Sequence, residues 1–121
     1  MEGQLDARMD EGGSNLSTGQ CQLISLARVF LRKSPLVVLD EATSAIDPET
    51  DAIVQETLRG ESFAGRTIIT IAHRLSTIMD YDRVVVMENG SVAEFDTPES
   101  LLQSEDGLFY ALVREAGLLR Q

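Results

Sequence analysis

Residues 36–47, LVVLDEATSAID, carry the clearest indication of the fold. They start with four consecutive apolar residues and become polar at Asp40 and Glu41. A short, continuous apolar run of this kind is typical of a strand that is buried on both faces of a parallel sheet. A second such run, residues 67–72, ends at His73. The sequence therefore predicts two buried strands with polar groups at their carboxyl ends.

A helix is predicted between the two strands, over residues 48–58, with Asp47 as its N-cap and a proline at its first position. This connection exceeds the roughly twelve residues that a parallel crossover requires, so the strands should lie parallel in one sheet. The carboxyl ends of parallel strands share one edge of the sheet, which is where open α/β sheets bind ligands. Asp40, Glu41 and His73 should therefore gather at one edge.

The flanking segments complete the predicted fold. Apolar residues spaced three and four apart predict an amphipathic helix over residues 17–33, and Ser17 with Gln20 forms a possible capping box at its start. Residues 1–15 should form a loop or a truncated entry segment. Downstream we expect a short helix, two strands around an Asn-Gly turn and two further helices, over residues 75–79, 83–87, 92–95, Pro98–Leu102 and Leu108–Glu115. The predicted class is α/β, with mainly parallel strands, a C-terminal β-hairpin and helices.

The composition excludes several kinds of function. The chain has 121 residues, 10 basic and 20 acidic, which leaves room for one domain or part of one. A chain whose only lysine is Lys33 offers no basic patch for phosphates, so a nucleic-acid partner is not expected. A single cysteine excludes an internal disulfide, and no apolar run approaches the roughly 18 residues of a membrane span. Any membrane role should come through a partner or another part of the protein.

Several segments together resemble a known family. Residues 11–20 read EGGSNLSTGQ, residues 36–47 read LVVLDEATSAID, and His73 lies in TIAHRLSTIMDYDRVVVMENG. They resemble the signature motif, the Walker B strand with the D-loop, and the switch histidine of the nucleotide-binding domain of ATP-binding cassette (ABC) transporters. The resemblance extends over about residues 5–118, and the segments MDYDR and GLFYALVREAGL are most similar to the second nucleotide-binding domain of the multidrug-resistance-associated (C) subfamily. It implies a P-loop NTPase-like fold.

The resemblance also implies a role for each matching residue. Asp40 would support Mg²⁺, Glu41 would act as general base on the attacking water, and His73 would contact the γ-phosphate of ATP. The positions expected to contribute to nucleotide binding through the signature, and through the D-loop at the dimer interface, are Ser17, Thr18, Gly19, Gln20 and Asp47. Thr18 departs from the usual LSGGQ sequence, and Ser17 taken alone would be interpreted as a helix cap.

One part of the family's ATP site is missing from the sequence. The Walker A loop, GxxxxGK[ST], requires glycines one and six residues before a lysine, and the residues at those positions before Lys33 are Arg32 and Ala27. We therefore expect residues 1–121 to be the C-terminal portion of one nucleotide-binding domain, with the Walker A half absent. In the family, two such domains pair head to tail, and each ATP lies between the Walker motifs of one and the signature of the other.

The expected function is ATP binding and hydrolysis that powers export at the cytoplasmic face of a membrane, in a transporter with transmembrane domains and a second nucleotide-binding domain. The isolated chain is expected to be inactive. The alternative from a different class is a non-catalytic interaction module that docks on another cassette. An ATPase of the structural-maintenance-of-chromosomes type is disfavoured because no coiled-coil heptads appear. A partial gene model without an independent role is the last alternative.

Overall fold

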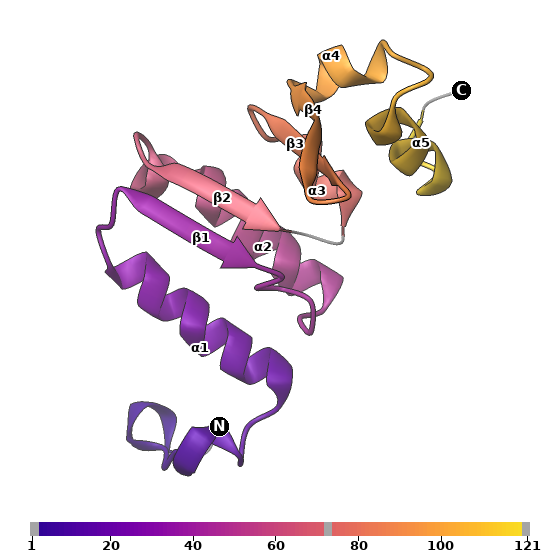
Figure 1. Cartoon of the computed structure of the whole chain (residues 1–121). Helices are drawn as coiled ribbons and strands as arrows, with labels where there is room; N and C mark the ends of the chain where they lie inside the picture. The colour runs from indigo at the N-terminus through magenta and orange to yellow at the C-terminus, as the bar shows by residue number, and fades with distance from the viewer. Residues whose placement is uncertain (1–2, 72–73, 120–121) are drawn as a thin grey trace. The chain divides into compact units, whose positions relative to one another are not determined.

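The computed structural model describes residues 3–71 and 74–119, and it divides the chain into two compact units, Met1–Ile71 and Ala72–Gln121 (Figure 1). The first unit contains the 3-10 helices η1 (Gln4–Asp6), η2 (Glu11–Gly13) and η3 (Glu61–Phe63), the helices α1 (Thr18–Leu31) and α2 (Pro48–Arg59), and the strands β1 (Leu36–Asp40) and β2 (Thr67–Ile71). The second contains α3 (Leu75–Ile78), β3 (Val84–Glu88), β4 (Ser91–Asp96), α4 (Pro98–Leu102) and α5 (Leu108–Glu115). This combination confirms the predicted α/β class.

β1 and β2 form a two-stranded parallel sheet in the first unit, as predicted. The register pairs Leu36 with Thr67 and Asp40 with Ile71, so the two strands end at the same level. α1, α2 and η3 pack on one face of this sheet and form the core of the unit with it. The buried core residues are Leu26, Val37, Leu39, Ile46, Val54, Leu58 and Phe63.

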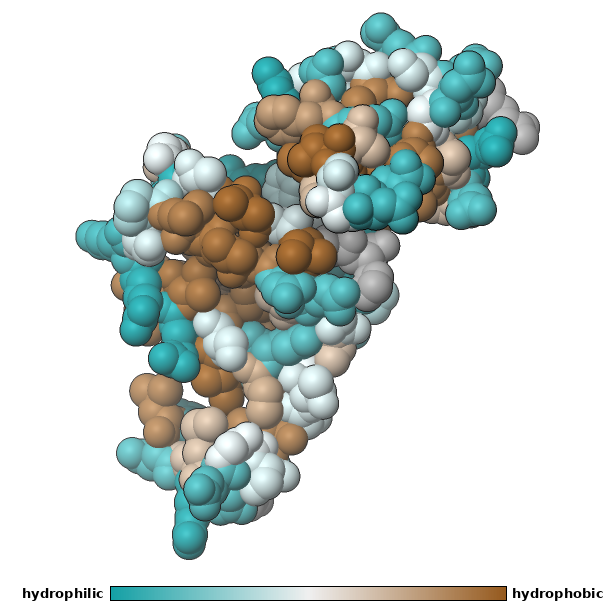
Figure 2. All heavy atoms as spheres, viewed as in Figure 1, coloured by the Kyte–Doolittle hydropathy of each residue, from teal (hydrophilic) through white to brown (hydrophobic). Residues whose placement is uncertain are grey.

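The other face of this sheet is open, so the prediction that the strands are buried on both faces is wrong. Leu36, Val38, Ile69 and Ile71 alternate with the core residues and are between 49% and 59% exposed. Figure 2 shows apolar atoms gathered over β1 and β2 on this side. Both long helices of the unit lie on the opposite face, and no described element of this unit covers these four side chains. We call these four residues the open sheet face.

Three helices begin with side-chain caps, and two of these caps, Ser17 and Asp47, are predicted from the sequence. The side chains of Ser17, Asp47 and Thr97 accept hydrogen bonds from the third residue of α1, α2 and α4 respectively, at 3.1, 2.9 and 3.1 Å. Each bond satisfies one of the backbone N–H groups that a helix start leaves without a partner. α1 ends at Leu31, two residues before the predicted end, because Arg32 is already extended with ψ at 136°.

The second unit is a β-hairpin packed against helices. β3 and β4 are antiparallel, and the turn residues Asn89 and Gly90 have φ values of 49° and 79°. Positive φ at both central residues is the requirement of a type I′ turn, which confirms the predicted Asn-Gly hairpin. The buried residues of this unit are Val84, Val86, Leu101, Phe109 and Val113. In the described ranges, no helix of either unit combines the length and apolar character needed to cross a bilayer.

Asp96 ends β4 and ties it to the start of α4. One carboxylate oxygen accepts a hydrogen bond from the Thr97 N–H at 2.7 Å, and the other accepts one from the Ser100 hydroxyl at 3.0 Å. These two bonds favour the ionised carboxylate, and they hold the pKa of Asp96 below its ordinary value.

Asp96→Asn should therefore remove an acid-sensitive contribution to stability. Because the pKa is lower in the folded state, this stabilisation is complete above the unfolded-state pKa of about 4 and is lost as the pH falls through the folded-state value. Urea unfolding at about pH 6 and about pH 3 should show a larger difference between parent and variant at the higher pH. Asp106→Asn, at an exposed position before α5, is the matched control, and an equal pH response in both variants would contradict the assignment.

Candidate functional site

The predicted meeting of the strand ends is confirmed for the described residues. Asp40 is the last residue of β1 and pairs with Ile71, the last residue of β2. The Glu41 N–H then donates to the Ile71 carbonyl at 2.8 Å, which extends the ladder by one bond beyond β1. Asp40 and Glu41 are both exposed at this edge. His73 lies outside the described residues, so its approach to the acidic pair stays a prediction.

Glu41 has an unusual backbone conformation. Its φ is 49°, in the left-handed region that costs a residue with a side chain roughly 1–2 kcal/mol. Glutamate is not among the residues that favour this region, so the sequence gives no sign of it. The conformation turns the chain away from the sheet directly after the strand. Local strain of this kind is concentrated at functional sites in proteins, and here it falls on the expected general base.

The capping box at the start of α1 is confirmed in full. The Ser17 hydroxyl accepts from the Gln20 N–H at 3.1 Å, and the Gln20 side-chain oxygen accepts from the Ser17 N–H at 3.0 Å. The Gln20 side chain is thus turned back toward Ser17. A hydroxyl that accepts one bond can still donate its own hydrogen, so the cap leaves Ser17 able to bind a phosphate oxygen.

The first N–H groups of α1 donate no hydrogen bond within the helix. The first intrahelical bond runs from the Cys21 N–H to the Ser17 carbonyl at 3.0 Å. The N–H groups of Thr18 and Gly19 therefore lie in the first turn, where a helix has no acceptor of its own to offer. Thr18 is exposed, and its side chain stands at the helix start where the usual motif has glycine.

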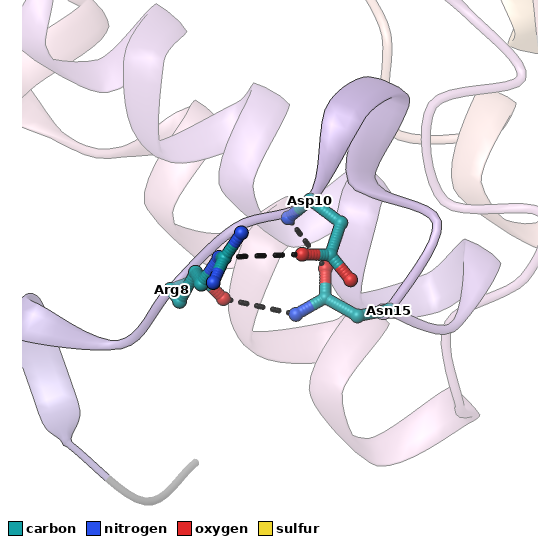
Figure 3. A network of polar contacts seen from close by, with 3 residues as sticks. All are labelled: Arg8, Asp10 and Asn15. Atoms are coloured by element: carbon teal, nitrogen blue, oxygen red, sulfur yellow. Dashed lines mark hydrogen bonds and ion pairs between the residues drawn. The ribbon is translucent and has the colours of Figure 1, made fainter.

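Asn15 shapes the segment that leads into the signature. Its side-chain oxygen accepts from the Asp10 N–H at 3.0 Å, and its amide nitrogen donates to the Arg8 carbonyl at 2.9 Å (Figure 3). The Arg8 side chain lies 3.7 Å from the Asp10 carboxylate in the same network. The sequence predicted only a loop here. The residue type could have indicated this network, because asparagine side chains commonly bond to nearby backbone in turns.

The loop after β1, residues 41–47, packs directly against the start of α1. A Cβ atom added to Gly19 would lie 2.5 Å from the Ala45 carbonyl oxygen, closer than real Cβ atoms come to backbone. The Gln22 side chain bonds to three groups of the same loop, including the Ser44 hydroxyl at 3.0 Å. Neither contact could be predicted from the sequence, because no local pattern indicates which loop a helix face will meet.

Asp47 closes this loop as the N-cap of α2, where its carboxylate accepts from the Thr50 N–H at 2.9 Å. Its predicted place at a dimer interface stays a prediction.

Asp40 is the residue that is expected to support Mg²⁺. Within residues 3–71 and 74–119, no three His, Cys, Asp or Glu side chains are grouped closely enough to hold a metal ion. Asp40 is a single exposed carboxylate at a strand end. Mg²⁺ typically takes one or two carboxylates and completes its shell with waters and substrate phosphates, so Asp40 fits that ion.

Known proteins are similar in sequence to this chain over nearly its whole length. The family model described as ABC transporter matches residues 1–44, which include the signature helix and β1. Metal resistance protein YCF1 of Saccharomyces cerevisiae is 59% identical over 117 residues, covering 97% of this chain and 8% of the relative. ATP-binding cassette sub-family C member 3 of Homo sapiens is 57% identical over 114 residues, covering 94% of this chain and 7% of the relative. The chain belongs to the ABC transporter family.

A solved structure of an ABC exporter contains the same fold as this chain. The structure of a bacterial Atm1-family ABC exporter with ATP bound is 34% identical, with a TM-score of 0.87, over 100% of this chain and 21% of that chain. The sub-family C relative confirms the predicted resemblance to the multidrug-resistance-associated (C) subfamily. The chain spans less than a tenth of the length of the two curated relatives. Its assignment to the second of two cassettes stays a prediction.

Proposed function

We propose that this chain forms the signature, Walker B and D-loop portion of a nucleotide-binding domain that hydrolyses ATP to power export. The domain would lie at the cytoplasmic face of a membrane, joined to transmembrane domains and paired head to tail with a second nucleotide-binding domain. The observation that supports this most is the shared edge at which β1 and β2 end, because Asp40 is the last residue of one strand and Glu41, the next residue, bonds to the other. The bacterial exporter similarity supports export as the purpose of hydrolysis.

Three residues at the sheet edge would serve the nucleotide held by this same domain. Asp40 would hold Mg²⁺, which when bound neutralises negative charge on the phosphates. Glu41 would accept a proton from the water that attacks the γ-phosphate, and its left-handed backbone fixes where the side chain leaves the loop. His73, two residues after β2, would donate a hydrogen bond to the γ-phosphate.

The start of α1 would serve the nucleotide held by the second domain. α1 has 14 residues, enough for a macrodipole that places about half a positive charge at its N-terminus. The Ser17 hydroxyl and the N–H groups of Thr18 and Gly19 would bind the γ-phosphate there. Gln20 would keep Ser17 in place through the capping box, and Asp47 would approach the facing domain.

The Walker A loop, which these 121 residues do not contain, would have to come from another segment. The isolated chain should therefore bind Mg-ATP at least about 100-fold more weakly than a complete domain, because two or more charge-assisted hydrogen bonds to the phosphates are missing. Isothermal titration with Mg-ATP measures this directly. Micromolar affinity of the chain alone would contradict the division of the site.

A chimera tests the proposed function. This chain would replace the matching 117-residue segment of the yeast metal resistance protein, whose remaining sequence would have to supply the Walker A loop and the membrane domains. We expect the chimera to hydrolyse ATP and to restore metal resistance in yeast lacking the relative, and Asp40→Asn in the chimera to abolish both. A chimera that is produced and assembled but hydrolyses no ATP would instead favour the non-catalytic docking module.

A further inference from the structure

We propose that Gln22 is a positioning residue, which fixes the loop of residues 41–47 to the signature helix so that Ser17 and Glu41 keep one mutual arrangement. The inference rests on the proposed function, because it assigns Gln22 a role in ATP hydrolysis. No motif of the sequence analysis includes Gln22, and it lies two residues after the signature.

The side-chain amide of Gln22 uses both of its ends on this loop. Its nitrogen donates to the Ser44 hydroxyl at 3.0 Å and to the Glu41 carbonyl at 3.4 Å. Its oxygen accepts from the Ala45 N–H at 2.9 Å. A planar amide with two donor hydrogens and one acceptor oxygen can make all three bonds at once. A carboxylate, an ammonium group or an aliphatic side chain lacks at least one of these functions.

Two other glutamines, Gln20 and Gln55, bond only to residues close to them in sequence. Gln20 bonds within its own capping box, and Gln55 donates to Asp51 one turn away on α2. Gln22 alone among these three bridges segments that are about twenty residues apart in sequence. It lies three residues after Gly19, on the same side of α1, where Gly19 permits the close approach to Ala45.

The bridge joins groups that would serve different nucleotides. Ser17 would face the nucleotide of the second domain, whereas Glu41 would act on the nucleotide of its own domain. The Glu41 carbonyl is itself one acceptor of the Gln22 amide, so the backbone of the general base is held directly. Loss of the bridge should therefore misplace Glu41 relative to the attacking water while the phosphate-binding groups remain.

The test measures ATP turnover in the chimera with three variants. Gln22→Leu, which removes all three bonds, should lower kcat about 10-fold with KM changed less than about twofold, because misplacement of a catalytic group affects the transition state. Gln22→Glu keeps acceptors for the Ala45 N–H and the Ser44 hydroxyl, so kcat should fall only about threefold. Gln55→Leu is the matched control and should leave kcat unchanged.

Thermal unfolding separates positioning from a merely structural role. If Gln22 only stabilised the fold, kcat of the folded protein would stay at the parent value while the unfolding temperature fell, and this result would overturn the proposal. Equal turnover loss in Gln55→Leu would overturn it as well. A fall in kcat in the order parent, Gln22→Glu, Gln22→Leu, measured at a temperature where each variant is fully folded, is the expected result, and it supports positioning whether or not the unfolding temperature also falls.

A second measurement does not depend on turnover. In the 121-residue chain, amide hydrogen exchange at Ala45 should be about 10-fold faster in Gln22→Leu than in the parent, because the N–H loses its acceptor. A parent chimera without ATPase activity would refute the proposed function, and Ala45 exchange would then still decide whether Gln22 holds the loop. Unchanged exchange at Ala45 would overturn the proposal whatever the chimera does.

Discussion

Glu41→Gln in the chimera should lower ATP turnover by about 10²–10⁴-fold, the usual contribution of a positioned general base. The amide has nearly the size of the carboxylate but cannot accept the proton of the attacking water. Mg-ATP affinity should stay within about twofold of the parent, because the phosphate-binding groups are untouched. Steady-state hydrolysis and equilibrium nucleotide binding measure the two effects separately.

Two further variants test the assignment. One controls for the Glu-to-Gln substitution, and the other separates the side chain of Glu41 from its backbone conformation. Glu56→Gln, at an exposed position of α2, is the matched control and should hydrolyse ATP at the parent rate. Glu41→Gly removes the side chain and relieves the left-handed strain, so it should stabilise the fold by up to roughly 1 kcal/mol while turnover is still lost. Hydrolysis in Glu41→Gln near the parent rate would remove the general-base assignment.

Most of the local structure was predictable because it depends on residues close together in sequence. The capping box needs only Ser17 and Gln20, and the hairpin turn needs only Asn89 and Gly90. The parallel pairing of β1 and β2 follows from two apolar runs separated by a long helical connection. Asp40 and Glu41 were therefore expected at the strand ends, because they directly follow the first apolar run.

The features that were missed depend on contacts between distant residues. The close approach of Gly19 to Ala45 and the three bonds of Gln22 join a helix to a loop that follows the next strand. The one-sided burial of the sheet was also missed. An apolar run predicts a strand with two apolar faces, but whether an element covers each face depends on the rest of the fold.

The open sheet face leaves stabilising apolar burial unused. Val38 and Ile69 are both more than half exposed although their sequence context is that of a buried strand. Burying a side chain of this size fully is worth about 1.5–3 kcal/mol relative to leaving it exposed. Structure that covered these four residues would therefore stabilise the unit.

Gly19→Ala should be the most damaging single-methyl change in the signature helix. The glycine φ is outside the left-handed region, so alanine can adopt the backbone and would gain up to about 1 kcal/mol of helix propensity. Against this, the new Cβ would lie 2.5 Å from the Ala45 carbonyl oxygen, a backbone atom that cannot rotate away. Overpacking typically costs about 1–3 kcal/mol, so after the gain in helix propensity is subtracted in full we expect the unfolding free energy to fall by up to about 2 kcal/mol.

The same displacement should affect catalysis more than stability. To accept the methyl group, either the start of α1 or the 41–47 loop must move, and a shift of about 1 Å can cost about 100-fold in rate. We therefore expect turnover of the Gly19→Ala chimera to fall about 100-fold, as measured by steady-state hydrolysis beside urea unfolding of the chain. Ser25→Ala, at an exposed position of the same helix, adds no atom against the loop and should keep both turnover and stability. If Gly19→Ala were as stable and as active as Ser25→Ala, the packing of the signature helix on this loop could not be what positions the two halves of the site.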